Sequence, residues 1–524
     1  MKTLKTRRGV AMLVTILMAS SLLIIVAPPA AACGFGTWYL PEGYTGGNFD
    51  TYILVQNPNE WDAEATVRFL TEQGATDPLE LELEGNSRTT VTVDEQPGLE
   101  DANVSTIVEA TSGVVVERAM YFTYADGKAG GSNSIGSQVM SNTWFLAEGY
   151  TGPGFDTYVL VMNPNEQDAC VSIKYVTPVA EGAGGGEDII KEYDVPAMTR
   201  YTIHVDEVEG LEDTEVSCVV TSVAPGAGEE GEPVKVVAER AMYYDYLGVD
   251  GGHASIGAPW TSSVWYLPEG RTAIDYDTFV LVMNPNNNSV KVKASFLVPA
   301  AGAGVGRQFN PNPPEDEEEP EPEPEPDTVI TKEYTVEPWQ RFTIAVDQIE
   351  GLAETDVATI IEAEPVEPEP EEGESGGGCA GVVVERAMYF ARGNNGDGHN
   401  TIGATCAREY WLLAEGYTAQ GFDTWVLLMN PNMVAVNVRC TFMVPEGEPV
   451  VREFEVAPRS RLTVPVDEIE GLEQTEVSTK VQVLGPVEGG GRQAACETPI
   501  VAERAMYFTY NGIVGGHSSM GVGE

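Results

Sequence analysis

The sequence predicts an all-β protein made of four tandem antiparallel β-sandwich modules of immunoglobulin-like type, preceded by an N-terminal signal segment. Two observations predict it. One set of motifs recurs four times with unchanged distances inside it. The segments between the Gly, Pro, Asn and Asp residues are short, apolar and rich in β-branched residues, as strands are. No window shows a convincing helical period.

Each repeat is recognised by a tryptophan followed at fixed distances by polar residues. An aspartate stands twelve residues after the tryptophan, an Asn-Pro-Asn turn begins seven residues later, and Glu-Arg-Ala-Met-Tyr comes near the end. Each repeat closes with a glycine-rich stretch. We therefore expect modules over residues 37–136, 144–257, 265–403 and 411–521, called repeats 1 to 4 below.

Seven short strands are expected in repeat 1. They cover residues 38–45, 49–57, 65–72, 79–84, 88–94, 104–111 and 114–122. Pro41 demotes the first of them to an edge or a strand end, because proline has no N–H for a sheet ladder. Seven antiparallel strands in about 100 residues are typical of a two-sheet sandwich.

Changes of length are concentrated in two slots. Between the aromatic residue of the third strand and the recurrent arginine the separations are 19, 25, 45 and 19 residues, and between the recurrent valine and the glutamate they are 13, 23, 28 and 26. Loops tolerate such insertions, whereas strands in a packed sheet cannot slip. In repeat 3 the slots hold acidic Pro/Glu inserts at 313–327 and 364–374, which we expect to be extended and solvated.

Residues 1–32 have the pattern of an export signal, in which basic residues precede an apolar run from Val10 to Ala27. Three fates remain open: cleavage after the small residues, lipidation of Cys33, or retention of the apolar run as an anchor. We expect an extracellular or cell-surface location, with contact to a membrane only through this segment.

The composition is strongly acidic, with a formal net charge of −52. A basic face is needed to bind phosphates, so nucleic acid is excluded as a partner. An acidic surface suits an exported, soluble protein and allows weak surface binding of Ca²⁺. We expect no other cofactor.

Six cysteines follow the export junction, which suggests disulfides in an oxidising compartment. Spacing favours Cys170 with Cys218, then Cys440 with Cys496 and Cys379 with Cys406. Repeat 1 has no cysteine of its own, so the scaffold does not need a bridge to fold.

The recurrent polar residues are interpreted as structural. In Glu117-Arg118 the period of two along a strand places the side chains on opposite faces, so at least one is half-buried and needs a partner, with Arg88 or Asp94 as the candidates. The recurrent set comprises Asp50, Asp156, Asp277 and Asp423; Glu117, Glu239, Glu385 and Glu503; Arg118, Arg240, Arg386 and Arg504; Arg88, Arg200, Arg341 and Arg461; and Asp94, Asp206, Asp347 and Asp467.

No catalytic or metal-binding constellation emerges from the sequence. A nucleophile elbow and a His-Glu-x-x-His motif are both absent, so we expect no enzyme activity. One binding feature remains, an exposed aromatic in the first loop of three repeats, at Tyr44, Tyr150 and Tyr417. Such residues can stack on sugar rings, or they can fold back over the adjacent strand.

The motif set as a whole resembles an uncharacterised family of repeat modules found in exported bacterial proteins, particularly of actinobacteria. The resemblance is carried by Trp-x-Leu-x-Glu-Gly-x-Thr, Phe-Asp-Thr with Asn-Pro-Asn, Glu-Arg-Ala-Met-Tyr and Gly-Gly-His-x-Ser-Ile-Gly, and it covers nearly all of residues 37–521. It implies an immunoglobulin-like fold and a surface location, and no activity.

These observations lead to an expected function and an alternative. We expect an exported, non-enzymatic structural or adhesion protein, an extended rod of β-sandwich repeats that contacts the cell envelope or an extracellular protein or glycan. A rod is expected because a constant joint of eight residues separates the modules. The alternative is a multivalent carbohydrate-binding array that uses the loops.

Overall fold

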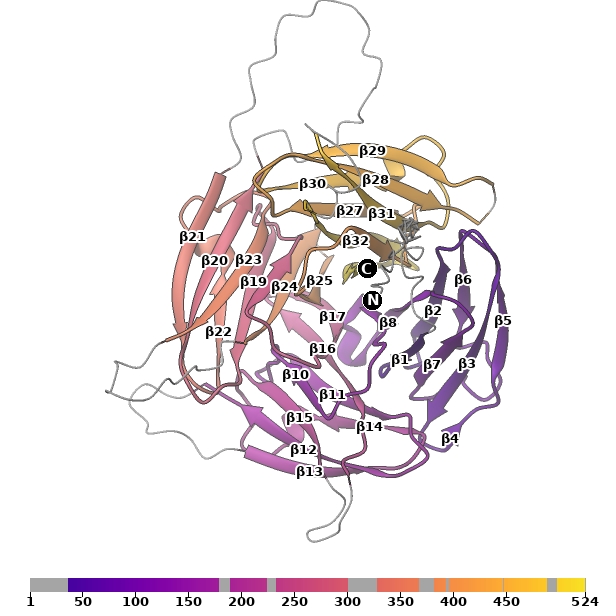
Figure 1. The fold of residues 1–524 in the computed structure, drawn as a ribbon. Helices are drawn as coiled ribbons and strands as arrows, with labels where there is room; N and C mark the ends of the chain where they lie inside the picture. Colours follow the sequence, from indigo (N-terminus) through magenta and orange to yellow (C-terminus); the bar gives the residue numbers. More distant parts are fainter. Residues whose placement is uncertain are drawn as a thin grey trace, which may run out of the picture.

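The computed structural model describes residues 36–523, apart from 179–188, 224–231, 300–327, 367–380, 393–394, 446 and 488–496. Its chain is all-β, as predicted, with antiparallel sheets and a few 3₁₀ turns (Figure 1). Among the described residues no helix is long and apolar enough to cross a membrane. The signal segment 1–32, Cys33, the insert 313–327 and most of 364–374 lie outside the described residues.

Repeat 1 begins with a four-residue strand that carries Trp38. Its strands are β1 (Thr37–Leu40), β2 (Phe49–Asn57), β3 (Ala63–Thr71), β4 (Gly74–Ala75), β5 (Leu79–Leu83), β6 (Ser87–Thr92), β7 (Ser105–Ala110), β8 (Val115–Thr123) and β9 (Ala129–Ile135), with the 3₁₀ turn η1 (Ala125–Gly127). The seven expected strands are present, with ends that shift by one or two residues, or by five at the end of β1.

The other repeats follow the same order. Repeat 2 has β10 (Thr143–Leu146), β11 (Phe155–Asn163), β12 (Ala169–Val176), β13 (Ile189–Val195), β14 (Thr199–His204), η2 (Val205–Glu207), β15 (Ser217–Val223), β16 (Val237–Tyr246) and β17 (Val249–Ile256). Repeat 3 has β18 (Val264–Leu267), β19 (Tyr276–Asn284), β20 (Val290–Val298), β21 (Thr328–Val336), β22 (Gln340–Ala345), η3 (Val346–Gln348), β23 (Ala358–Pro365), β24 (Val383–Arg392) and β25 (Asn395–Ile402). Repeat 4 has β26 (Tyr410–Leu413), β27 (Phe422–Asn430), β28 (Val436–Met443), β29 (Val450–Val456), β30 (Ser460–Pro465), η4 (Val466–Glu468), β31 (Ser478–Pro486), β32 (Val501–Tyr510), β33 (Ile513–Met520) and β34 (Val522–Gly523).

Two antiparallel sheets arise from each repeat. In repeat 1 the order is β1-β7-β3-β4, with β5 also on β3, in one sheet and β6-β2-β8-β9 in the other. The same two orders recur in the later repeats, and β34 adds an edge strand in repeat 4. Apolar residues of both sheets form one core, which in repeat 1 joins Trp38, Val67 and Phe69 to Ile53 and Val115.

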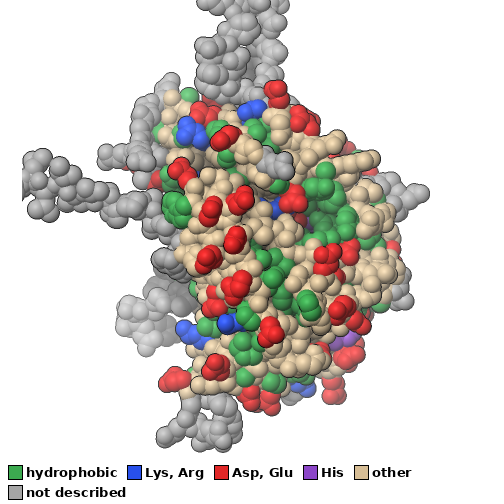
Figure 2. Space-filling model, turned by 90° about the vertical axis from the view of Figure 1, so that its right-hand side faces the viewer, with side chains coloured by type: hydrophobic (Ala, Val, Ile, Leu, Met, Phe, Trp, Pro, Cys, Tyr) green, Lys and Arg blue, Asp and Glu red, His purple; other side chains and the backbone are tan. Residues whose placement is uncertain are grey.

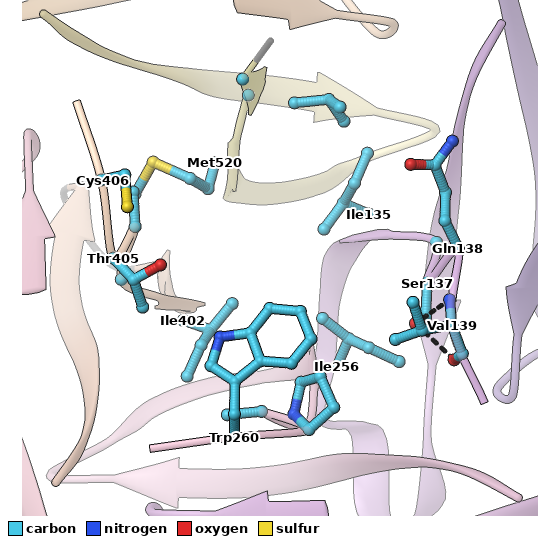
Figure 3. A pocket seen from close by; sticks show the side chains of 18 of the residues that line it. Ile135, Ser137, Gln138, Val139, Ile256, Trp260, Ile402, Thr405, Cys406 and Met520 are labelled. Carbon is cyan, nitrogen blue, oxygen red and sulfur yellow. Dashed lines mark hydrogen bonds between the residues drawn. The ribbon is translucent and has the colours of Figure 1, made fainter. Parts of the chain in front are cut away.

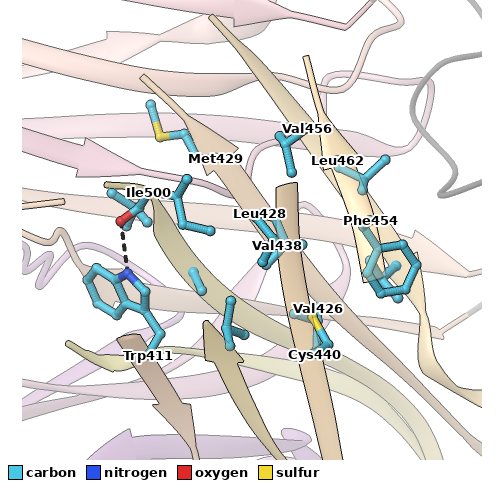
Figure 4. Close-up of a cluster of buried hydrophobic side chains, with 14 of the residues drawn as sticks. Trp411, Val426, Leu428, Met429, Val438, Cys440, Phe454, Val456, Leu462 and Ile500 are labelled. Carbon is cyan, nitrogen blue, oxygen red and sulfur yellow. Dashed lines mark hydrogen bonds between the residues drawn. The ribbon is translucent and has the colours of Figure 1, made fainter. Parts of the chain in front are cut away.

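The core of repeat 4 shows how the tryptophan is held (Figure 4). Trp411 lies on the short first strand and is 3% exposed. Its indole N–H donates to Ile500 O at 2.8 Å, next to Val426, Leu428 and Val438 of the same cluster. Trp144 and Trp265 make the same bond to Val236 and Val382, whereas the buried indole N–H of Trp38 has no hydrogen-bond partner among the described residues. The recurrent tryptophan is therefore a core residue whose donor is satisfied in repeats 2, 3 and 4.

The Asn-Pro-Asn sequence forms the tight turn that was predicted. Asn57 is fully buried, and its amide donates to Trp61 O at 2.9 Å and to Leu83 O at 3.1 Å. Its Oδ1 accepts the N–H of Asn59 at 3.1 Å. Asn163, Asn284 and Asn430 repeat these bonds, so the motif joins two loops of each repeat.

One strand that is present in all four repeats was not expected from the sequence. The closing glycine-rich stretch, which is not among the seven expected strands, forms β9 in repeat 1 and β17, β25 and β33 in the others. Glycine has a low β propensity, so this glycine-rich segment did not have the sequence pattern of a strand. The glycines are needed because the four strands crowd together at the centre of the molecule, where β9 contacts β17 and β33, and β25 contacts the same two.

The expected extended rod is wrong, because the repeats close into a ring around these central strands (Figure 1). Repeat 4 packs on repeat 1: Tyr121 and Phe508 stack edge to face with ring centroids 5.0 Å apart, and Arg504 pairs with Glu117 at 3.1 Å. A constant joint imposes a constant rotation, and here that rotation closes after four repeats rather than extending the array.

The predicted disulfide between Cys170 and Cys218 is also wrong. Both cysteines are free, on the neighbouring strands β12 and β15. Cys170 is opposite Val223, and Cys218 is opposite Tyr175, five residues along the strand. Five residues span about 17 Å and bring the side chains to opposite faces, whereas a disulfide needs Cα atoms within about 7 Å. Cys406 and Cys440 are free, and their predicted partners Cys379 and Cys496 lie outside the described residues.

Candidate functional site

The recurrent Glu-Arg pair lies at the interfaces between repeats. Glu117 and Arg118 are both fully buried on β8, and their side chains point to opposite faces of the strand. Arg118 faces repeat 2, where it meets Glu239 Oε1 at 3.0 Å, while Glu117 faces repeat 4 and meets Arg504. One dipeptide therefore connects each repeat to both of its neighbours.

The same bonds run around the whole ring. Each of these arginines pairs with the glutamate of the next repeat: Arg118 with Glu239 (3.0 Å), Arg240 with Glu385 (3.2 Å), Arg386 with Glu503 (3.0 Å) and Arg504 with Glu117 (3.1 Å). Each also pairs with a glutamate of its own Trp-x-Leu-x-Glu motif: Arg118 with Glu42 (2.9 Å), Arg240 with Glu148 (2.7 Å), Arg386 with Glu269 (2.9 Å) and Arg504 with Glu415 (2.9 Å).

The partners expected for this pair were wrong. Arg88 does not meet Glu117; its guanidinium donates to Gly416 O at 2.9 Å and to Glu476 Oε2 at 2.6 Å, both in repeat 4. Arg200, Arg341 and Arg461 likewise reach carbonyl oxygens of the preceding repeat, at Gly43, Gly149 and Gly270. The glutamates at 42, 148, 269 and 415 were overlooked, although they recur in the sequence at a fixed distance of four from the tryptophan.

The recurrent aspartates have separate roles. Asp94 Oδ2 accepts the N–H of Thr51 at 2.8 Å inside its own repeat, as Asp206 does from Thr157. Asp50 Oδ2 instead accepts from the Tyr510 hydroxyl of repeat 4 at 3.0 Å, so it belongs to an interface rather than only to the glycine-rich loop beside it. Asp277 accepts from Tyr246, and Asp156 from Lys128, in the same way.

Burial changes the proton affinities of these groups. It raises the pKa of the Glu148, Glu415 and Glu503 carboxyls to about 7, although the arginine beside each one acts in the opposite direction. Burial lowers the pKa of His253, His399 and His517 well below the usual value, and the adjacent arginine lowers it further. The histidines are therefore neutral in the folded ring.

These histidines make a pH prediction possible. His517 Nδ1 lies 3.1 Å from Arg504 and 3.5 Å from Glu415, and its Nε2 lies 3.5 Å from the Tyr121 hydroxyl. Below pH 6.5 the unfolded chain takes up a proton at this residue and the folded chain does not, so stability falls by about 1.4 kcal/mol per pH unit for each such histidine. Between pH 7.5 and pH 5 the free energy of unfolding of His517→Gln should therefore fall by about 2 kcal/mol less than that of the wild type. Urea unfolding at both pH values measures this difference. Equal losses would contradict the assignment.

Two cavities open at equivalent interfaces. The first lies between repeats 1 and 2 and holds about 360 Å³; the second lies between repeats 2 and 3 and holds about 390 Å³. The first is lined by Glu42, Gly43, Tyr44, Phe49, Asn103, Tyr124, Tyr158, Leu160, Arg200, Thr202, Ala241 and Tyr243. The second is lined at the same repeat positions by Glu148, Gly149, Tyr150, Phe155, Glu215, Tyr246, Phe279, Leu281, Arg341, Thr343, Ala387 and Tyr389, with four further residues. We call them the first and second clefts.

The two clefts share a layout of aromatic walls and a polar floor. In the first cleft Tyr124 stacks on Tyr243 at 4.1 Å, and the Tyr124 hydroxyl is 2.7 Å from that of Tyr158. In the second cleft Tyr246 and Tyr389 lie 4.5 Å apart. Aromatic faces with a few convergent polar groups are typical of sites for small ligands.

Two of the three tyrosines singled out from the sequence, Tyr44 and Tyr150, line these clefts. Tyr44 folds back edge-on against Phe49 at 5.0 Å, and still lines the first cleft. Tyr150 does the same against Phe155 at 4.8 Å in the second cleft. Tyr417 packs on Phe422 at 4.9 Å at the equivalent place in repeat 4. In repeat 3 Arg271 replaces the tyrosine and pairs with Asp356 at 2.9 Å.

A third cavity of about 340 Å³ opens at one end of the ring (Figure 3). Ile135, Ile256, Ile402 and Met520, one from each central strand, point into it, and Trp260 stands at its side. Trp260 is 54% exposed. The lining is mostly apolar but includes Gln138, Thr405 and Arg408, and none of the glutamates and arginines of the buried ion pairs contributes to it.

One group of side chains has the composition of a metal site. Asp156, His204 and Asp206 bring one ligand atom each to within 4.8 Å of one another. Lys128 Nζ lies 2.7 Å from Asp156 Oδ2, so a cation already faces this carboxylate. Thr, Ala and Pro replace His204 in the other repeats, so the group occurs once around the ring.

Comparisons with known proteins add little. No protein-family model matches the chain, and no curated protein sequence matches it. The crystal structure of Thermotoga maritima 1070 is 18% identical over 22% of this chain and 96% of its own, with a TM-score of 0.19, and the Anabaena sensory rhodopsin transducer is 17% identical over 17% and 97%, with 0.15. The structure of glycoside hydrolase family 32 from Bifidobacterium adolescentis is 10% identical over 93% and 96%, with 0.13. At these TM-scores the similarities carry no argument.

Proposed function

We propose that this chain is an exported, non-enzymatic carbohydrate-binding protein of the cell surface or extracellular space, in which four immunoglobulin-like modules form a ring with binding clefts at their interfaces. The proposal also places the chain in the uncharacterised repeat family that its motifs resemble. A structural role as an extended rod loses its support, because the repeats close on themselves.

One observation carries the proposal: the first and second clefts have nearly equal volumes and are built from the same positions of successive repeats. Both clefts also keep the same arrangement of aromatic side chains beside a glutamate and an arginine, which is the composition of a site for a small ligand. At the floor of each cleft the glutamate pairs with an arginine of its own repeat, and the cleft arginine donates to a glycine carbonyl of the preceding repeat. These bonds hold the walls in place before a ligand arrives.

The chemistry of the walls favours a sugar. Sugar rings have apolar faces that stack on aromatic side chains, and hydroxyl groups that bond to tyrosine hydroxyls and carboxylates at the edge. On the face shown in Figure 2 acidic side chains are more frequent than basic ones, and the chain has a formal net charge of −52. This negative charge favours neutral glycans of the envelope over acidic ones. Several weak sites on one rigid ring would gain affinity for a glycan-coated surface through avidity.

A glycan array probed with the full chain from residue 33 onward tests the proposal. Neutral glycans should be retained, and the triple variant with Ala at Tyr44, Tyr150 and Tyr417 should bind about threefold to tenfold more weakly to each site, the usual worth of an aromatic contact. The matched control is Trp61→Ala, because Trp61 is 57% exposed and lies outside the clefts. Absence of binding to any glycan, or equal losses in both variants, would contradict the proposal.

Export is tested separately by the mass of the mature amino terminus in the native host. Cleavage before Cys33, lipidation of Cys33 and retention of the apolar run give three different masses. Recovery of the full chain from the cytosol alone would remove the export part of the proposal.

A further inference from the structure

The four central strands differ at one position that faces the axis of the ring. Repeats 1, 2 and 4 have glycine there, at Gly130, Gly251 and Gly515, whereas repeat 3 has Asp397. Asp397 is fully buried, and its carboxylate lies against all three glycines. The chain therefore places one carboxylate among the central strands of all four repeats.

This carboxylate receives a hydrogen bond from every repeat. Its Oδ2 accepts the N–H groups of Gly131 at 3.1 Å and Gly516 at 3.2 Å. Its Oδ1 accepts those of Gly252 at 3.2 Å and Gly398 at 2.8 Å, together with the Tyr244 hydroxyl at 3.2 Å. The five donors lie on five different strands, and together these strands come from all four repeats.

The glycines opposite Asp397 are required by this arrangement. A Cβ atom at Gly251 would lie 2.0 Å from Asp397 Oδ1, and one at Gly130 or Gly515 would lie 2.7 or 2.5 Å from Oδ2. Any side chain there would overlap the carboxylate. The recurrent Gly-Gly of the closing stretch thus makes a space of the size of one carboxylate, lined by backbone N–H groups.

Convergent backbone N–H groups form a concave array of positive dipoles, which binds anions. Among the described residues the hydrogen-bond partners of Asp397 are N–H and O–H groups, and none of them is a Lys or Arg side chain. Burial raises the pKa of this carboxyl, and the glycine N–H bonds act against that rise. A higher pH therefore favours the anionic form in the array.

We propose that the four glycine N–H groups at the centre of the ring form an anion-binding site that the chain fills with its own Asp397 carboxylate, and that a small monovalent carboxylate such as formate occupies it when that side chain is removed. In the native protein Asp397 acts as an internal ligand that joins the central strands of all four repeats. This role is independent of the clefts between repeats.

Asp397→Gly tests the proposal, because it makes repeat 3 match the other three. The full-length variant is melted at pH 8 in a buffer of a bulky sulfonate at constant ionic strength, with formate replacing part of the sulfonate. Its melting temperature should lie below that of the wild type and rise by several degrees with formate, saturating in the millimolar range, since a ligand of the folded state stabilises it by mass action. The wild type, whose site is filled, should not respond in a saturable way.

Two variants complete the experiment. Asp250→Gly changes an exposed aspartate on the neighbouring strand β17 and should show no saturable response. Asp397→Asn keeps the shape and replaces an acceptor with a donor, so it should melt below the wild type. If Asp397→Gly does not fold without formate, the yield of refolding with and without formate replaces the melting curve. The proposal would be overturned if formate gave no saturable response in Asp397→Gly. It would also be overturned if Asp397→Asn were as stable as the wild type.

Discussion

Replacing Arg240 with methionine should lower the free energy of unfolding by about 3–5 kcal/mol, the usual cost of removing one partner from a buried ion pair. Arg240 is 1% exposed, and it holds Glu148 at 2.7 Å and Glu385 at 3.2 Å. Methionine fills most of the volume but neutralises neither carboxylate. The two glutamates would remain at an interface with no water to solvate them.

The measurement is equilibrium unfolding in urea at pH 8, where carboxyls with a pKa of about 7 are ionised. Arg439→Met is the matched control, because Arg439 pairs with Glu453 at 2.6 Å but both side chains are 41% exposed. An exposed pair contributes less than about 1 kcal/mol. Similar losses in the two variants would show that the ring of buried charges does not hold the repeats together.

Ending the chain after Gly403 should lower the melting temperature of the remaining three repeats by about 10 °C or more and cause them to associate. The truncation removes repeat 4, which supplies Arg504 to Glu117 and Glu503 to Arg386. It also uncovers Tyr121, which packs on Phe508. Each kcal/mol lost lowers the melting temperature by about 2–4 °C in a folding unit of about 150–250 residues, and the truncation opens two interfaces at once.

A circular permutant is the control for this truncation. Joining Glu524 to Gly36 through two glycines gives the same eight-residue distance from Gly521 to Trp38 that the other joints have, and the chain is then opened between Val139 and Met140. This protein keeps all four interfaces and should melt close to the wild type. Truncation without effect would mean that the repeats are independent, as in a rod.

The strands and the core were predictable because their signals are local. The apolar strand before Asn-Pro-Asn and the β-branched residues near Arg88 mark β2 and β6, and both form as expected. Strand β9, which was not predicted, has the sequence Ala-Gly-Gly-Ser-Asn-Ser-Ile, and this sequence has no local strand preference. It forms because the central strands pack against one another, a contact between residues more than 100 positions apart.

The candidate site was predictable only in part. Tyr44, Tyr150 and Tyr417 were selected as ligand contacts, and the first two line the clefts. The opposite walls, such as Tyr243 and Tyr389, sit inside the Glu-Arg-Ala-Met-Tyr motif and gave no sign of exposure to a cavity. A cleft between repeats depends on how two sheets meet, and no pattern within one repeat describes that.

The amino-acid sequence alone determined the all-β class, the repeat and its strand-forming segments, because strand periodicity and turn residues act over a few positions. It also placed Glu117 and Arg118 on opposite faces of a strand, since side chains alternate there. Only the tertiary structure decided that those faces meet the neighbouring repeats, that the array closes after four, and that the Asp397 carboxylate lies among the central strands of all four repeats. The angle between packed repeats sets all three, and that angle arises from side-chain packing across interfaces rather than from any local pattern.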